Sequence, residues 1–255
     1  MSEHILTDLE NGILTVRLSR AAKKNALTAE MYSALAAALD RAGRNGDVSV
    51  VLLAGSEGVF TAGNDLEDFL RNPPKGADAP VFRFIAGLVG TDVPLVAAVD
   101  GVAVGIGTTL LLHCDYVVAS DRSRFSLPFI NLALVPEAGS SMLLVEACGY
   151  RKAAELLMFG EPFSADRALD CGIVSRICAP GDVMERAREA AALLAAKPRG
   201  ALRATKRLLR RAREPMADRV RAEGLLFGEC LESPEAKEAF RAFLEKRAPD
   251  FSRFA

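Results

Sequence analysis

The chain has 255 residues, of which 50% are hydrophobic and 25% charged, so it holds enough apolar material for a globular core. Its 32 basic and 33 acidic residues leave a net charge of -1, which argues against nucleic acid or an anionic membrane as the main partner. The five cysteines lack a CxxC pair and the histidines are only His4 and His113, so we expect reduced thiols and no metal site. The acidic N-terminus and the absence of a long uncharged apolar run predict a cytoplasmic protein with no membrane span.

The first half of the chain is predicted to alternate strands with helices. Apolar and polar side chains alternate over residues 13–19, which is typical of a half-buried strand. Continuous apolar runs predict fully buried strands, a feature of sheets that are covered on both faces. These runs are residues 49–55, 94–101 and 115–120.

Two helices are expected between these strands. Thr28 is a candidate N-cap for a helix that runs to about Arg44 with an apolar stripe on one face. Another helix is expected to start within residues 104–114, whereas residues 71–80 combine Pro, Gly and charge and predict a loop. The alternation of elements predicts an α/β fold.

From about Arg151 the pattern is almost entirely helical. Helices are predicted in residues 151–160, 164–172, 184–198 and 199–214. The last helix lies within residues 233–247, with Ser233 as N-cap and Pro234 at the first helical position. We therefore divide the chain into an α/β core over residues 1–195, which would hold the active site, and a C-terminal helical region over residues 196–255.

Two glycine-bearing turns are the main candidates for chemistry. Residues 58–69 (GVFTAGNDLEDF) follow a buried strand, and residues 98–110 (AVDGVAVGIGTTL) run from a strand into a helix. Gly105 and Gly107 allow a ligand to approach the main chain closely, and a helix beginning there directs unpaired N–H groups at it. Two such turns from adjacent strands can aim two backbone N–H donors at one oxygen, the geometry of an oxyanion hole. The dinucleotide fingerprint G-x-G-x-x-G is incomplete because position 110 is Leu.

The two turns also carry a family resemblance. FTAGNDL at residues 60–66, followed by PLVAAVDGVAVGIGTTLLLHCDYVVASDRSRF at residues 94–125, resembles the enoyl-CoA hydratase/isomerase (crotonase) superfamily. The resemblance continues through residues 159–177 and 233–251 and so covers nearly the whole chain. It implies a crotonase-like (ClpP/crotonase) spiral of repeated ββα units, with C-terminal helices that drive assembly into a homotrimer or a hexamer. It also implies an acyl-CoA thioester as ligand, with no cofactor beyond the coenzyme A of the substrate.

The resemblance implies site residues as well. The oxyanion donors would be the backbone N–H groups of Ala62 and Ile106. Phe243 and Lys246 would reach the nucleotide end of coenzyme A, whereas the alternative is that they are a packing residue and a surface charge. For Asp65 the alternative is a cap of its own turn. The candidate substrate- and CoA-binding residues are Lys23, Lys24, Ala62, Gly63, Asn64, Asp65, Leu66, Phe69, Gly105, Phe129, Phe243 and Lys246. Apolar side chains of residues 66–90, together with Phe129, are expected to line the acyl pocket or to pack in the core.

The reaction is narrowed by two departures from the family pattern. Enoyl-CoA hydratases use two glutamates to activate water, and the matching positions carry Thr109 and Phe129. Neither side chain can act as a general base at neutral pH. The remaining acid is Glu137, which lies just before a helix opened by residues 139–141. This pattern resembles the Δ3,Δ2-enoyl-CoA isomerase branch, in which this glutamate is the catalytic base.

The isomerase hypothesis has a chemical basis of its own. Moving a double bond from C3–C4 to C2–C3 requires one proton to leave C2 and one to reach C4, and a single carboxylate can do both. Burial is expected to raise the pKa of Glu137, whereas the helix N-terminus is expected to lower it. The apolar neighbours expected to cause this burial are Leu132, Leu134, Val135 and Met142.

Other functions remain open from the sequence. Glu137 alone could activate water in a hydratase, and a non-catalytic acyl-CoA-binding trimer is a further alternative. The Arg-rich residues 203–213 are the one feature that favours nucleic acid, although a solvated helix face or a trimer contact explains them better. His113 is expected to be a packed core histidine.

Overall fold

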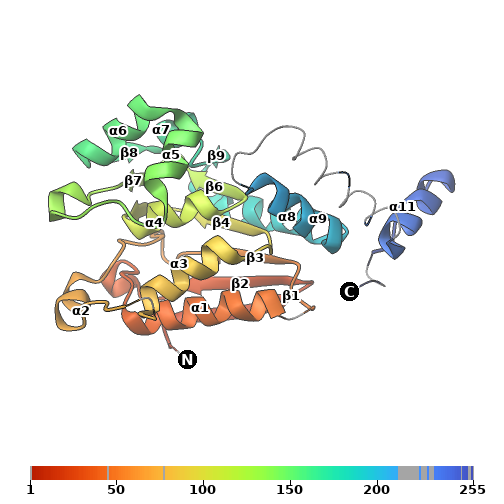
Figure 1. Cartoon of the computed structure of the whole chain (residues 1–255), viewed down its shortest axis with the longest axis horizontal. Helices are drawn as coiled ribbons and strands as arrows, with labels where there is room; N and C mark the ends of the chain where they lie inside the picture. Colours follow the sequence, from red (N-terminus) through yellow and green to blue (C-terminus); the bar gives the residue numbers. More distant parts are fainter. Residues whose placement is uncertain are drawn as a thin grey trace.

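The computed structural model of the chain describes residues 2–44, 46–76, 78–211, 224, 229, 233–247, 249–251 and 254, with only the backbone described at 240, 241, 243 and 244. Two sheets organise the core (Figure 1). The large sheet has the order β1-β2-β3-β4-β6-β9 and is parallel except for the β1–β2 pair, and the small sheet has the order β5-β7-β8. The strands are β1 Ile5–Glu10, β2 Ile13–Leu18, β3 Val50–Ala54, β4 Leu95–Val99, β5 Val102–Val104, β6 Tyr116–Ser120, β7 Arg124–Ser126, β8 Phe163–Ser164 and β9 Arg176–Cys178.

The central strands β3, β4 and β6 of the large sheet are buried on both faces, as their continuous apolar runs predicted. Alternate residues of β3 enter two different apolar clusters: Val51 and Leu53 pack in the main core, whereas Val50 and Leu52 pack with residues of α8. Successive side chains of a strand point to opposite faces, so a strand covered on both sides must be apolar throughout. Helix α8, from the second half of the sequence, therefore completes the core that the first half begins.

The expected repeated ββα units are present. β4 is followed by β5 and then by α4, and β6 is followed by β7 before the chain turns toward α5. In each unit the first strand joins the large sheet and the second joins the small one. The bridge between Thr61 and Ala103 brings the segment after β3 alongside β5 in the same way. This layering sets the two glycine-bearing turns side by side.

The helices begin where their capping residues predicted. Thr28 Oγ1 accepts the N–H of Met31 at 3.3 Å, and Ser233 Oγ accepts the N–H of Ala236 at 3.1 Å. Residues 72–79 separate α2 from α3, as the Pro and Gly content indicated. The helices are α1 Ala29–Arg44, α2 Leu66–Arg71, α3 Pro80–Gly90, α4 Ile106–Thr109, α5 Ser140–Cys148, α6 Tyr150–Phe159, α7 Ala165–Asp170, α8 Val183–Ala195, α9 Arg199–Leu209 and α11 Pro234–Leu244, with short 3-10 turns η1 Ala21–Lys23, η2 Leu110–His113, η3 Ile130–Leu132 and η4 Pro180–Asp182.

Several strands escaped the sequence analysis. β1 is an edge strand whose central side chains are exposed, so it lacks the apolar alternation of a half-buried strand. β5, β7, β8 and β9 have only two or three residues each, too few for any period to be read. The expectation of an almost entirely helical second half is wrong at β8 and β9, because β8 pairs with β7 and β9 completes the edge of the large sheet.

Helix α9 uses its basic side chains to hold the core. Lys206 is buried, and its Nζ donates to the Val93 carbonyl oxygen at 2.8 Å and to Asp115 Oδ2 at 2.6 Å. Arg203 and Arg207 both pair with Asp92. The described part of the Arg-rich segment thus serves internal contacts. In Figure 1, α2 and α11 lie at opposite ends of the long axis of the molecule. Among the described residues, no helix has the length and apolar character to cross a membrane.

Candidate active site

The two glycine-bearing turns contact each other directly. The N–H of Thr61 donates to the Val102 carbonyl oxygen at 2.9 Å, and the N–H of Val104 donates to the Thr61 carbonyl oxygen at 3.0 Å. A Cβ added to Gly63 would lie 2.6 Å from the Val104 carbonyl oxygen, and one added to Gly107 would lie 2.5 Å from Thr61 Cγ2. Both glycines are therefore required for this close approach.

The expectation that the Ala62 N–H faces a ligand is wrong. That N–H donates to the Lys24 carbonyl oxygen at 2.9 Å, so it is already satisfied. Asn64 lies two residues after Ala62, and Leu27 forms hydrogen bonds with both of its neighbours. The Leu27 N–H donates to the Gly63 carbonyl oxygen at 2.8 Å, and the Leu27 carbonyl oxygen accepts the Asp65 N–H at 2.9 Å. The Asn64 N–H points away from Leu27 and has no acceptor in the described part of the chain. Asn64 replaces Ala62 as the candidate donor on this turn.

The second turn holds the other candidate donor, Ile106. Gly105 has φ 55° and ψ -117° and turns the chain from β5 into α4, which begins at Ile106. The N–H groups of Thr108 and Thr109 donate to the Gly105 carbonyl oxygen, each at 2.9 Å, whereas the Ile106 N–H has no acceptor among the described residues. A Cβ on Gly105 would meet no atom within 4 Å, so the space before this turn is open. A ligand oxygen there can approach the main chain without a side chain in the way.

Glu137 is tied to the same helix that carries the Ile106 donor. The hydroxyl of Thr109 donates to Glu137 Oε1 at 2.7 Å. The backbone of Glu137 is held by Ser140, whose N–H and hydroxyl both donate to the Glu137 carbonyl oxygen, at 3.0 and 2.7 Å. Thr109 thus directly orients the Glu137 carboxyl group.

The pKa of Glu137 is raised above its ordinary value because burial disfavours the charged carboxylate, and the Thr109 hydrogen bond offsets this only in part. The apolar neighbours named from the sequence are not themselves buried: Leu132, Leu134, Val135 and Met142 are all exposed. The carboxyl group instead lies near two fully buried polar residues, Thr109 on α4 and Tyr32 on α1. A carboxyl whose pKa lies nearer neutrality is better suited to give back the proton that it removes.

Tyr32 is a site residue that the sequence analysis missed. It is only 1% exposed, and its hydroxyl donates to Asn64 Oδ1. Burial and the nearby charge of Glu137 raise the pKa of Tyr32 well above its ordinary value. The sequence does not indicate this contact, because Tyr32 lies next to Met31 in a helix whose buried side chains predict only packing in the core.

Two polar residues have the structural roles that were considered for them. His113 is buried, and its Nε2 donates to the Ala138 carbonyl oxygen at 2.8 Å, next to Glu137. Burial lowers the pKa of His113. Asp65 caps α2 by accepting the N–H groups of Glu67 and Asp68, and its pKa is lowered by its hydrogen bond to Arg20. Both side chains are committed to holding turns of the site.

The other predicted site residues lie around these turns or far from them. Lys23, Lys24 and Leu66 are exposed near the first turn, Phe69 is partly buried, and Phe129 is buried in the core. In the expected acyl-pocket segment, Phe84 and Leu88 are core residues, whereas Leu70 is 85% exposed. Lys246 is exposed beyond the end of α11, at the opposite end of the molecule from α2, and the Phe243 side chain lies outside the described residues.

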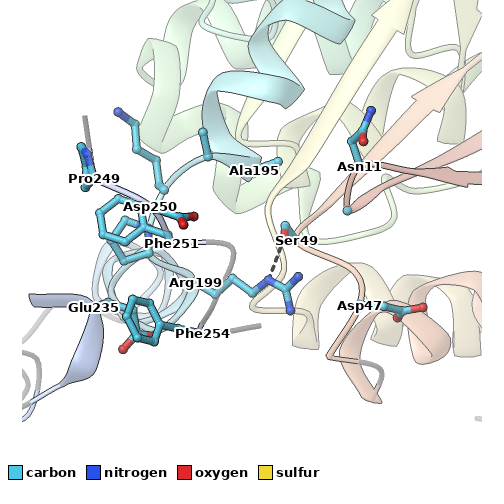
Figure 2. A pocket seen from close by; sticks show the side chains of 14 residues that line it. Asn11, Asp47, Ser49, Ala195, Arg199, Glu235, Pro249, Asp250, Phe251 and Phe254 are labelled. Carbon is cyan, nitrogen blue, oxygen red and sulfur yellow. Dashed lines mark hydrogen bonds between the residues drawn. The ribbon is translucent and has the colours of Figure 1, made fainter. Parts of the chain in front are cut away.

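A separate cleft of about 610 Å³ opens beside α9, between the core and the C-terminal segment (Figure 2). Arg199 crosses it, and its Nε donates to Ser49 Oγ at 2.7 Å. The remaining charged side chains are of both signs: Asp47, Glu235 and Asp250 oppose Lys197. None of the glycine-bearing turns, Glu137 or Tyr32 lines this cleft, so it is not the site described above.

Comparisons with known proteins show which family the chain resembles. The family model described as enoyl-CoA hydratase/isomerase matches residues 8–253. The chain is 32% identical over 253 residues to the 2,3-dehydroadipyl-CoA hydratase of Escherichia coli, covering 98% of this chain and 99% of that protein. It is 32% identical over 255 residues to human enoyl-CoA delta isomerase 2, covering 96% of this chain and 64% of that protein. A solved structure from Magnetospirillum magneticum, described as an enoyl-CoA hydratase/carnithine racemase, has a TM-score of 0.96 and 48% identity, covering 99% of this chain and 100% of that one.

Proposed function

This chain belongs to the enoyl-CoA hydratase/isomerase family, and we propose that it moves the double bond of a 3-enoyl-CoA to the 2-position with Glu137 as the single acid and base. The observation that carries the proposal is the bond from Thr109 to Glu137, at a position where a two-carboxylate hydratase would have a second acid. With one carboxylate oriented by a hydroxyl, the site is better equipped for proton transfer between carbons than for activating water.

The proposed reaction takes two proton transfers. The N–H groups of Asn64 and Ile106 donate to the thioester oxygen while the Glu137 carboxylate removes a proton from C2. The electron pair of the broken C–H bond moves into the thioester and forms a dienolate whose oxygen carries the negative charge. Glu137 then returns the proton to C4, which takes it with the electron pair of the C3–C4 double bond. The thioester carbonyl re-forms, and the electron pair shared by C1 and C2 becomes the new double bond between C2 and C3. No water is consumed and no cofactor beyond the coenzyme A of the substrate is needed.

A second candidate is a hydratase in which Glu137 alone activates water. It is favoured by the name of the Escherichia coli relative, and the same oxyanion donors would serve it. The two reactions share the ligand and the first contacts and differ in what Glu137 acts on. A direct assay therefore has to separate them.

Substrate binding is proposed to involve residues of two protomers. Lys23, Lys24, residues 62–66, Phe69, Gly105 and Phe129 would contact the acyl-CoA from one protomer. Because α11 lies far from α2 of its own chain, Phe243 and Lys246 would reach the nucleotide end of coenzyme A only in a neighbouring copy. This assigns residues 196–255 to assembly and substrate capping, in a homotrimer or a dimer of trimers.

The test is a paired assay of the wild type and Glu137→Gln. A 3-enoyl-CoA and a 2-enoyl-CoA are supplied separately, and the absorbance of the conjugated enoyl thioester is followed. We expect a rise with the 3-enoyl-CoA that Glu137→Gln reduces by roughly a thousandfold, since the amide can neither accept nor return the proton. The matched control is Glu146→Gln, on α5 and outside the site.

Each other result points to a different function. Loss of absorbance with the 2-enoyl-CoA, without a rise in the first assay, would overturn isomerisation in favour of single-base hydration. Binding of both thioesters without turnover, and unaffected by Glu137→Gln, would indicate a non-catalytic acyl-CoA-binding protein. Equal activity of the wild type and Glu137→Gln would remove Glu137 from the reaction.

A further inference from the structure

Tyr32 is a core residue whose one polar side-chain atom, the hydroxyl oxygen, contacts the candidate active site. Its ring packs against Phe84 with the centroids 5.7 Å apart, and the side chain is almost completely buried. Phenylalanine would fill the same space without the need to satisfy a buried hydroxyl. The hydroxyl of Tyr32 donates to Asn64 Oδ1, which gives the polar atom a specific partner.

Asn64 is the residue whose orientation matters most on the first turn. Leu27 holds the peptide groups on both sides of it, through the Gly63 carbonyl oxygen and the Asp65 N–H, and no described residue accepts the Asn64 N–H. The Asn64 side chain is then fixed by Tyr32. A donor that must meet a developing oxyanion is effective only when its direction is fixed before the reaction.

Both holding contacts come from one rigid unit. Leu27 precedes the α1 N-cap Thr28, and the Tyr32 N–H donates to the Thr28 carbonyl oxygen at 2.9 Å in the first turn of that helix. The N–H of Ala29 donates to Asp68 Oδ2 at 2.7 Å, which ties the start of α1 to α2 on the far side of Asn64. The turn is therefore braced from the start of α1, through Leu27, Ala29 and Tyr32.

We propose that Tyr32 is a positioning residue of the oxyanion hole: its hydroxyl fixes Asn64 so that the Asn64 N–H stays directed at the thioester oxygen. The proposal rests on the acyl-CoA thioester ligand of the proposed function and is independent of which reaction follows. The nearby negative charge of Glu137 favours the protonated phenol, so Tyr32 remains a donor to Asn64 while Glu137 acts as a base.

The main test removes the hydroxyl and keeps the ring. Tyr32→Phe is expected to lower kcat about tenfold with KM changed less than about twofold, because a misdirected donor is lost chiefly in the transition state. Asn64→Ala keeps the backbone N–H but removes the partner of Tyr32, and it should reproduce that loss. In the double variant the losses should not add, since both changes break one contact. Tyr150→Phe, at an exposed tyrosine that begins α6, is the matched control.

A spectroscopic readout separates this proposal from the proposed function. A saturated acyl-CoA labelled with carbon-13 at the thioester carbonyl binds without reacting, and hydrogen bonds to its oxygen lower the carbonyl stretching frequency. We expect the downshift on binding to the wild type to shrink with Tyr32→Phe and with Asn64→Ala, and to persist with Tyr150→Phe. This result would support the positioning role even if no double bond were moved.

Two results would overturn the proposal. One is a carbonyl band and a kcat in Tyr32→Phe that match the wild type. The other is full additivity in the double variant, which would mean that Tyr32 and Asn64 act separately. If Tyr32→Phe fails to fold, Asn64→Ala alone decides, because an unchanged carbonyl band in that variant would show that the side-chain contact does not direct the donor.

Discussion

The turns that carry Asn64 and Ile106 offer backbone groups to a ligand, whereas the turn that carries Glu137 offers a side chain. The first two are locked to each other by hydrogen bonds between Thr61 and β5 and by glycines that admit no side chain. The third is a surface turn with Ala133, Ala138 and Gly139 at positive φ. The chemistry of the two glycine-bearing turns depends on the direction of their backbone N–H groups, whereas that of the third turn depends on the Glu137 carboxyl group and its surroundings.

This difference predicts opposite tolerance to substitution. The Ile106 side chain can change as long as the chain path is kept, whereas the glycines that set the path cannot, and the Asn64 side chain is constrained by its contact with Tyr32. At Glu137, activity is expected to depend less on the backbone path than on the carboxyl group itself and on its hydrogen bond from Thr109. The following variants test each half of this comparison, from the largest expected effect to the smallest.

The largest of these effects is expected for Gly105→Ala. The added Cβ meets no atom within 4 Å, but φ 55° with ψ -117° is unfavourable for alanine, so the turn would shift and redirect the Ile106 N–H. Loss of one oxyanion donor typically costs roughly a hundredfold in kcat or more. Gly149→Ala is the matched control, since Gly149 also has positive φ and open space but lies between α5 and α6. If both variants kept full kcat, the backbone side of the comparison would be refuted.

The next effect concerns the pH dependence of Glu137. The Thr109 hydroxyl stabilises the charged carboxylate and so lowers its pKa, and Thr109→Val should raise that pKa further. Because the ionised form is the base, kcat/KM rises with pH through this pKa, and the acidic limb of the profile should move to higher pH. In the control Thr108→Val, the lost hydroxyl is bonded to the Ala103 carbonyl oxygen instead. An acidic limb that stays in place in Thr109→Val would exclude Thr109 from tuning the base.

A stability effect should accompany the raised pKa. The folded state disfavours ionised Glu137, so the wild type loses stability as the pH rises from the ordinary carboxyl range through the raised pKa. Glu137→Gln, which keeps an oxygen for Thr109, should increase the free energy of unfolding at neutral pH by roughly 1 kcal/mol. Denaturant titrations should show the gain vanishing at low pH, where both side chains are neutral. A gain that persists there would have another cause.

The smallest effect on catalysis is expected for Ile106→Val. Ile106 is fully buried, so the loss of a methylene group should cost about 1 kcal/mol of stability. Its N–H is unchanged, and kcat should stay within about threefold of the wild type because only the backbone donates. A large fall in kcat with unchanged stability would show that the side chain itself contacts the substrate.

Much of the fold follows from local patterns. The apolar strands β3 and β4, the alternating strand β2 and the caps Thr28 and Ser233 all lie where simple periodicity and capping rules put them. The short strands of the small sheet do not, because strands of two or three residues are defined by their partners and not by a pattern of their own. Edge strand β1 was missed for the related reason that its exposed side chains carry no apolar signal.

The candidate site divides in the same way. The sequence by itself located the glycine turns, and the family resemblance carried by its motifs proposed Ile106 as a donor and Glu137 as the acid, because motifs depend only on residue type and spacing. Only the tertiary structure decided that the Ala62 N–H is satisfied by Lys24, that the Asn64 N–H has no acceptor in the described parts of the chain, and that Tyr32 contacts the Asn64 side chain. These contacts join segments about 30 or more residues apart, and whether a polar group is free depends on what folding places opposite it.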